Sequence, residues 1–226
     1  MKWLLLILPT ILLAAYTSGE MSCYDESVQG CTGIIGDMLE NCNAEIESFT
    51  KTNQTLQAYA NQQIEKSFQY LLLSANFGTF VKNRPGFKKQ FNALSDKAWE
   101  NGINIIKHIT KRGSQHNFGA VSDMRTTTRA PKSLDLNEIG ALALSLSYEK
   151  AFLVEAHQIH RSYSHAYHKH HYDPEIAHFM EEEFFGKQVE TIRNLSGYVN
   201  DLQKMAKNAE DISLSLFMFD EYLAKQ

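Results

Sequence analysis

The chain has 226 residues, enough for one domain with a sizeable core and barely enough for two. Its composition is typical of a soluble globular protein, with charges of both signs mixed and a formal net charge of −4 at pH 7. A nucleic-acid partner requires a basic face to neutralise phosphates, so the charge balance gives no support for one.

The first 19 residues have the pattern of a secretory signal peptide. Lys2 provides a short positive region, an apolar run extends from Trp3 to Ala15, and small or polar residues follow over 17–19. No other run approaches the roughly 20 apolar residues that a transmembrane helix requires. The sequence therefore predicts no membrane partner and a secreted protein, or one held in the lumen of the secretory pathway.

Residues 20–54 form an N-terminal arm that contains all three cysteines, Cys23, Cys31 and Cys42. An odd number in a secreted chain leaves two arrangements open. Either one internal disulfide leaves the third cysteine to pair with another chain, or one internal disulfide leaves a buried free thiol. The arm contains no histidine that could activate a catalytic thiol.

Two sequons are candidates for N-linked glycosylation, at Asn53 and Asn194. Asn53 is expected near the start of a helix, where an acceptor is accessible. Asn194 is expected inside a later helix, where access is poorer. The sequence therefore favours Asn53 as the acceptor.

Residues 55–226 contain long helical patterns with few interruptions. Pro85, Pro131 and Pro174 each lie where a helix should begin or a loop should end, and Gly113 is a suitable helix stop. We predict helices over residues 55–81, 85–112, 133 to beyond 155, 174–207 and 211–223. Asp173 is the expected N-cap of the fourth helix, and 135–138 resembles a capping box.

The predicted loop over residues 114–132 is long for a compact domain, and such loops commonly cross the fold. Two helices, a long crossover, two more helices and a short fifth helix indicate an all-α four-helix bundle with one long connection. No repeat and no strand alternation competes with this fold. A secreted helical cytokine is an alternative four-helix bundle, but it would have two crossovers.

Each of the four long predicted helices has a polar residue on its expected inward face where an apolar one would be usual: Glu65, Asn101, Glu149 and Gln188. On the first helix, the inward face is expected to consist of Asn61, Glu65, Phe68, Leu72 and Ala75. Burying an unpartnered carboxylate costs several kcal/mol, roughly. Two explanations remain open, a cation bound at the centre of the bundle or a hydrogen-bonded polar network with water.

Several short segments, in this order and at these separations, resemble ferritin. They are Ile64–Ser74, Leu146–Lys150, Asp173–Pro174, Phe179–Glu181, Gln188–Val189 and Leu216–Asp220. The signal peptide and the cysteine-containing arm are similar to those of secreted insect ferritins, and within these to the light-chain type. The resemblance implies a ferritin-like bundle in residues 55–226 and iron, stored as a mineral, as the cargo.

The resemblance also implies a di-iron oxidation centre at Glu65, Ala98, Asn101, Glu149 and Gln188. Glu65, Glu149 and Gln188 match ligands of the family, whereas Ala98 and Asn101 stand where a Glu and a His are expected. We therefore expect a partial metal site and no enzyme activity in this chain. A heavy-chain-like partner would oxidise Fe(II); a ferroxidase-active subunit with a reduced centre is the alternative.

Further iron-contacting residues are implied in two places. Glu181 matches an acid of the ferritin threefold channel, and His178 replaces its partner acid. Glu100 matches one acidic position associated with mineral nucleation, whereas Lys97 and Ile103 depart from that pattern.

The last predicted helix is too apolar for a free surface, with Leu214, Leu216, Phe217, Met218 and Phe219 close together. It could fold back onto its own bundle or pack with copies of itself. The resemblance implies that it lies at a fourfold axis of a hollow shell of two dozen subunits, shared with the heavy-chain-like partner.

A cysteine of the N-terminal arm is a candidate for an inter-chain disulfide.

Seven of the nine histidines lie between His157 and His178. Imidazoles at this density could bind Zn, Cu or iron, or sense pH. The alternative is a solvated polar turn, and the ferritin resemblance gives this stretch no role.

Overall fold

The computed structural model describes residue 44 and residues 49–118, 134–164, 172–208 and 211–226. The chain divides into two units, Met1–Ala44 and Glu45–Gln226, and all the described helices belong to the second. The predicted signal peptide over 1–19, the cysteines Cys23, Cys31 and Cys42, and most of the crossover lie outside the described residues. The predicted boundary of the arm at residue 54 stays a prediction.

The helical unit consists of long helices, as the sequence predicts. The helices are α2 (Phe49–Phe77), α3 (Pro85–Lys111), α4 (Glu138–Ser164), α5 (Pro174–Met180), the π-helix η3 (Glu181–Phe185), α6 (Gly186–Asn208) and α7 (Ile212–Lys225). No strand occurs in the described ranges. The predicted all-α four-helix bundle with a short fifth helix is confirmed.

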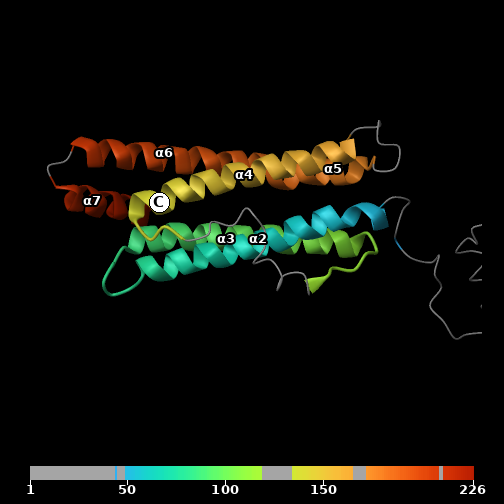
Figure 1. The fold of residues 1–226 in the computed structure, drawn as a ribbon, viewed down its shortest axis with the longest axis horizontal. Helices are drawn as coiled ribbons and strands as arrows, with labels where there is room; N and C mark the ends of the chain where they lie inside the picture. The colour runs from blue at the N-terminus through green and yellow to red at the C-terminus, as the bar shows by residue number, and fades with distance from the viewer. Residues whose placement is uncertain (1–43, 45–48, 119–133, 165–171, 209–210) are drawn as a thin grey trace, which may run out of the picture. The chain divides into compact units, whose positions relative to one another are not determined.

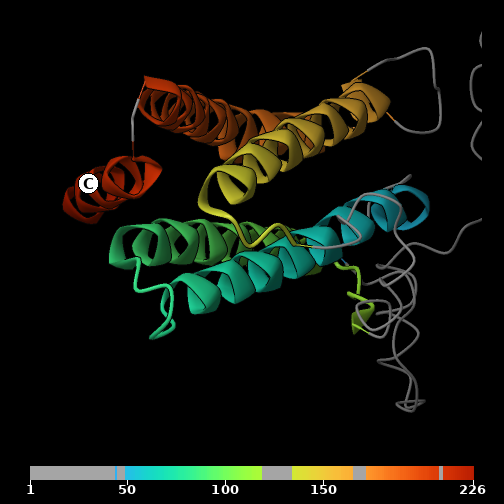
Figure 2. The same cartoon turned by 60° about the vertical axis from the view of Figure 1, so that its left-hand side comes forward.

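The bundle is built from two pairs of helices (Figure 1). The helices α2 and α3 pack along each other, and α4 packs against the consecutive helical segments α5, η3 and α6. In the second view the two pairs form separate layers, and α7 lies beside the end of α3 (Figure 2). The core between the layers contains Tyr59, Phe91, Phe152, Phe184 and Leu195, all buried.

Helices begin at residues whose side chains can accept hydrogen bonds from the free N–H groups of the first turn. Asp173 accepts from the backbone N–H groups of Glu175 and Ile176, as predicted. The predicted capping box at 135–138 is wrong, because Asn137 Oδ1 accepts from Ile139 N and caps α4. The carboxylate of Glu138 instead faces Arg84 and Lys82, at 3.3 and 3.7 Å.

The C-terminus of α3 confirms the predicted stop at Gly113, which has a φ of 83°. Gly113 N donates to Thr110 O, and Ser114 N donates to Ile109 O. These two bonds form a Schellman motif, which needs a left-handed residue that glycine adopts without strain.

The predicted fourth helix is interrupted by the π-helical turn η3, at residues 181–185. This differs from the single helix expected over 174–207, because spacing alone does not detect one inserted residue. Beyond the turn, Gln188 remains buried as predicted, and Leu195 and Leu202 are buried with it.

The predicted inward face of α2 is wrong. Phe68 is 60% exposed and Leu72 is 43% exposed, whereas Tyr59, Lys66 and Tyr70 are buried. The sequence of α2 contains two apolar stripes, and periodicity cannot tell which of them faces the core. The structure turns inward the stripe that contains Lys66.

None of the described helices combines the length and the apolar character needed to cross a bilayer.

Candidate functional site: a buried ion pair at the centre of the bundle

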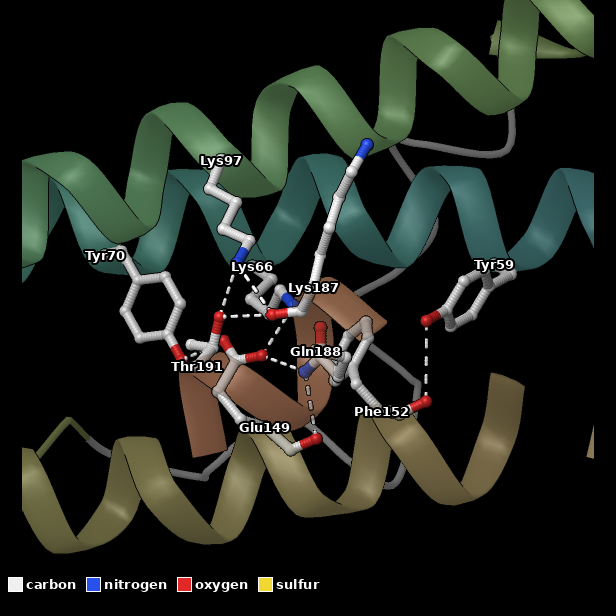
Figure 3. Close-up of polar contacts among 9 residues, drawn as sticks. All are labelled: Tyr59, Lys66, Tyr70, Lys97, Glu149, Phe152, Lys187, Gln188 and Thr191. Atoms are coloured by element: carbon white, nitrogen blue, oxygen red, sulfur yellow. Dashed lines mark hydrogen bonds and ion pairs between the residues drawn. The ribbon is translucent and has the colours of Figure 1, made fainter. Parts of the chain in front are cut away.

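A lysine and a glutamate meet in the core, halfway along the bundle (Figure 3). Lys66 comes from α2 and is 2% exposed, and Glu149 comes from α4 and is also buried. The Nζ of Lys66 lies 3.1 Å from Oε2 of Glu149. The ammonium also lies 4.2 Å from the centre of the Phe152 ring, close enough for a cation–π contact.

The carboxylate of Glu149 accepts hydrogen bonds from three side chains on two helices. Besides Lys66, Tyr70 donates from α2 to Oε1 at 2.6 Å, and Gln188 Nε2 donates from α6 to Oε2. Gln188 Nε2 also lies 3.1 Å from the backbone oxygen of Glu149. Charge-assisted hydrogen bonds of this number offset much of the cost of removing a carboxylate from water.

Burial dominates the electrostatics of this cluster. It lowers the pKa of Lys66 from its ordinary value, although the charge of Glu149 acts in the opposite direction. Burial, with the adjacent charge of Glu149, raises the pKa of Tyr70 well above its ordinary value. Tyr70 is therefore a neutral hydrogen-bond donor at physiological pH.

The facing part of α3 supplies no anionic ligand to this cluster. Ala98 and Asn101 are both buried there. The neighbouring Lys97 points toward α6, where its Nζ donates to Thr191 Oγ1 at 2.5 Å and to the backbone oxygen of Lys187 at 2.8 Å. Burial lowers the pKa of Lys97, although the charges of Glu149 and Glu190 act in the opposite direction.

The structure brings Glu149 and Gln188 together, as the sequence predicts, but their third neighbour is Lys66. Glu65 is half-buried on the adjacent flank of α2, where Gln69 Nε2 lies 3.4 Å from its Oε1. Across residues 49–118, 134–164, 172–208 and 211–226, no three His, Cys, Asp or Glu side chains are arranged to hold a metal ion. Lys66, Tyr70 and Gln188 form a hydrogen-bonded polar network around Glu149, and the partial metal site expected from the sequence stays a prediction.

The predicted channel residues lie in α5 and at the start of η3. His178 and Glu181 are exposed, and Glu181 Oε1 lies 2.7 Å from His160 Nε2. With Tyr172 and Ser164 they line an open pocket of about 270 Å³. His165, His168, His170 and His171 lie outside the described residues.

The remaining predicted residues lie on the surface or under it. Glu100 is exposed on α3, and Asn194 is exposed on α6. Asn53, the favoured glycosylation acceptor, is only 5% exposed, and its Nδ2 donates to Ser114 Oγ. In the folded chain Asn194 is therefore the more accessible of the two sequons.

Sequence reasoning missed Lys66 and Tyr70. Both lie on the second apolar stripe of α2, with Leu56, Tyr59, Gln63, Leu73 and Phe77 at alternating spacings of three and four. A lysine on such a stripe is the signal that could have identified the cluster, because lysine is rarely buried without a partner.

Comparison with known proteins agrees with the fold. The model of the ferritin-like domain matches residues 53–205. The ferritin light chain of Trichoplusia ni is 40% identical over 232 residues, covering 100% of this chain and 99% of that one. The ferritin light chain of Drosophila melanogaster is 39% identical over 219 residues, covering 94% and 93%.

A solved structure supports the same assignment. The crystal structure of Trichoplusia ni secreted ferritin matches with a TM-score of 0.81 and 40% identity, covering 92% of this chain and 100% of that chain. The chain therefore belongs to the ferritin family and is an iron-storage subunit similar to the light chains of insect ferritins.

Proposed function

We propose that this chain is the light-type subunit of a secreted ferritin and has no ferroxidase activity of its own. It stores ferric mineral in a shared shell, and a heavy-chain-like partner oxidises Fe(II). The observation that carries the proposal is the ammonium of Lys66, 3.1 Å from the carboxylate of Glu149.

Lys66 supplies the positive charge that Glu149 would otherwise take from a metal ion. A cation entering the cluster would have to displace a buried ammonium from a carboxylate that also accepts from Tyr70 and Gln188. Ala98 and Asn101 offer no second carboxylate or imidazole on α3. Metal catalysis requires a fixed set of ligands with an open position, and this cluster provides neither.

Two exposed apolar surfaces support assembly into a shell. Phe68, Leu71 and Leu72 form one along α2, and Leu214, Phe217 and Met218 form another on α7. Apolar surfaces of this kind on a soluble subunit indicate contacts with other chains. The secreted relative and the signal-peptide pattern of residues 1–19 support a secretory location.

Stopped-flow oxidation of Fe(II) by the purified homomeric shell tests the proposal. We expect no fast phase above the rate in buffer, and we expect slow iron retention in a particle of shell size. Shells mixed with a heavy-chain-like subunit should oxidise Fe(II) rapidly. The comparison of homomeric with mixed shells distinguishes iron storage by this chain from Fe(II) oxidation by its partner.

The variant Glu65→Ala identifies the source of any fast phase. A fast phase in the homomer that this substitution abolishes would establish the reduced-centre ferroxidase instead. Elution of the homomer as a monomer without iron would contradict the storage role.

A further inference from the structure

A second charged cluster joins the end of α3 to the start of α5, at the end of the bundle rather than its centre. His108 and Arg112 come from the last turn of α3 and the residue after it, and Asp173 and Glu175 come from the start of α5. Arg112 Nη2 lies 2.7 Å from Asp173 Oδ2, and Arg112 Nη1 lies 2.5 Å from Glu175 Oε2. These ion pairs hold the first turn of α5 against α3.

Asp173 has two tasks in this cluster. Its Oδ1 accepts from the N–H groups of Glu175 and Ile176, at 3.2 and 3.3 Å, and so caps α5. Its other oxygen accepts from Arg112. The guanidinium of Arg112 in turn lies 4.6 Å from the ring of Phe49, the first residue of α2. The cluster therefore fixes the N-terminus of α5 against two other helices.

His108 completes the cluster from a buried position. It is 7% exposed, and its ring stacks flat on that of Phe179, with centroids 3.9 Å apart and planes 11° apart. His108 Nε2 lies 3.1 Å from the same Oε2 of Glu175 that Arg112 contacts. A neutral imidazole protonated on Nε2 can donate this bond.

We infer that His108, Arg112, Asp173 and Glu175 form an acid-sensitive latch that holds the first turn of α5 at neutral pH and loosens when His108 becomes protonated. The charged groups facing His108 are Glu175 from α5, and Arg112 and Lys111 from its own segment. Protonation would add a positive charge beside Arg112, inside a stack with Phe179 that is largely removed from water. The half-exposed Glu175 is already shared with Arg112 and compensates this charge only in part.

The sign of the effect follows from the pKa of His108. Burial lowers this pKa below the ordinary histidine value of 6.5, and the positive charges of Arg112 and Lys111 add to the decrease, against the opposing effect of Glu175. The state in which the first turn of α5 is released therefore binds more protons than the state in which the latch holds it. The stabilisation that His108 gives to the held turn is complete above about pH 6.5. It is lost as the pH falls toward the lowered pKa.

Asp173 responds in a different range of pH. Burial acts to raise its pKa, but the hydrogen bonds from Arg112 and from Ile176 N outweigh it, so the pKa lies below the ordinary value. Its contribution is complete above about pH 4 and is lost only as the pH falls further. Mild acid therefore acts on the latch through His108. The released first turn is followed along the chain by His178, in the last turn of α5, and then by η3.

Hydrogen exchange on the full, assembled chain tests the latch. Protection of the amides of residues 175–180 is measured between pH 7.5 and 5.5 and corrected for the intrinsic pH dependence of exchange. We expect protection to fall with acidification, by at most about tenfold per pH unit for a single proton. His108→Gln keeps a donor for Glu175 and does not titrate, so its protection should be independent of pH.

His116→Gln is the matched control. His116 is also partly buried with a lowered pKa, but its Nε2 contacts Asn61 of α2, 2.8 Å away. This variant should keep the pH dependence at 175–180. If His108→Gln does not assemble, His108→Leu keeps an apolar side chain against Phe179 and serves the same purpose. A wild-type protein without pH dependence there, or a His108 variant that retains it, would overturn the latch.

Discussion

Lys66 places an ammonium group against the buried carboxylate of Glu149. Removing an ammonium and a carboxylate from water costs several kcal/mol for each ion, roughly, and their attraction offsets this only with good geometry and further hydrogen bonds. Tyr70 and Gln188 supply those bonds to Glu149. The two charges therefore compensate each other, and removing either residue would leave the other ion buried without its partner.

Lys66→Met should destabilise the folded subunit strongly. The substitution leaves the carboxylate of Glu149 buried without its cation, at a cost of about 3–5 kcal/mol. Thermal or denaturant unfolding, followed by circular dichroism, measures the effect. A loss below about 1 kcal/mol would mean that water reaches Glu149 and that the pair is not buried in solution.

The double variant Lys66→Met with Glu149→Gln is the control for this interpretation. Removing both charges together avoids an unpaired buried ion, so most of the lost stability should return. A double variant as unstable as Lys66→Met alone would show that the loss comes from packing and not from charge.

At the scale of elements, α7 is held against α3 by a carboxylate at a helix start. Asp220 is buried on α7, and its Oδ1 accepts from Phe87 N in the first turn of α3 at 2.9 Å. Burial raises the pKa of Asp220, although hydrogen bonds from the first turn of α3 act against this. The approach is possible because residue 86 is a glycine: an added Cβ would lie 1.9 Å from the backbone oxygen of Asp220.

Gly86→Ala should therefore displace α7 from α3. The clash is with backbone atoms and cannot be relieved by a side-chain rotation. Hydrogen exchange over residues 212–225 should increase, while α4 remains protected. Gly197→Ala is the matched control on α6, where nothing lies within 4 Å of the added methyl group.

The control variant should be neutral or slightly stabilising, by about 0.5–1 kcal/mol, because alanine has the higher helix propensity. Unchanged exchange of α7 in Gly86→Ala would mean that α7 is not packed on α3 as described.

At the scale of the whole molecule, the apolar faces of α2 and α7 require partners. Leu214 is 60% exposed on α7, and Phe217 and Met218 lie exposed beside it. A free subunit with these faces would expose apolar surface to water at about 25 cal/mol per Å². Assembly is the physical means of burying it.

Leu214→Asp should reduce the fraction of protein in the large particle, because burying a new carboxylate in an apolar contact is costly. Size-exclusion chromatography with light scattering measures the distribution. Ser213→Asp is the matched control, since it adds the same charge to an exposed neighbouring position near the N-terminus of α7. Equal particle fractions for the two variants would show that the α7 face is not an assembly contact.

The helices and several of their ends follow from local features of the sequence. Pro85, Asp173 and Gly113 act through local bonds within a turn or two, so their effect is visible in the order of residues. The buried faces of α3 and of the segment from Gln188 onward were also predictable, because each has one dominant apolar stripe. Glu149 and Gln188 were identified for the same reason.

Which stripe of α2 faces the core depends on contacts with the other helices. The stripes that contain Phe68 and Tyr70 have similar periodicity, and the choice depends on what the opposite helix presents. Glu149 on α4 presents a carboxylate, which Lys66 can neutralise and Phe68 cannot. Contacts between residues far apart in the sequence, here 83 positions, leave no local signal, and so the ion pair at the centre of this ferritin subunit became apparent only in the folded chain.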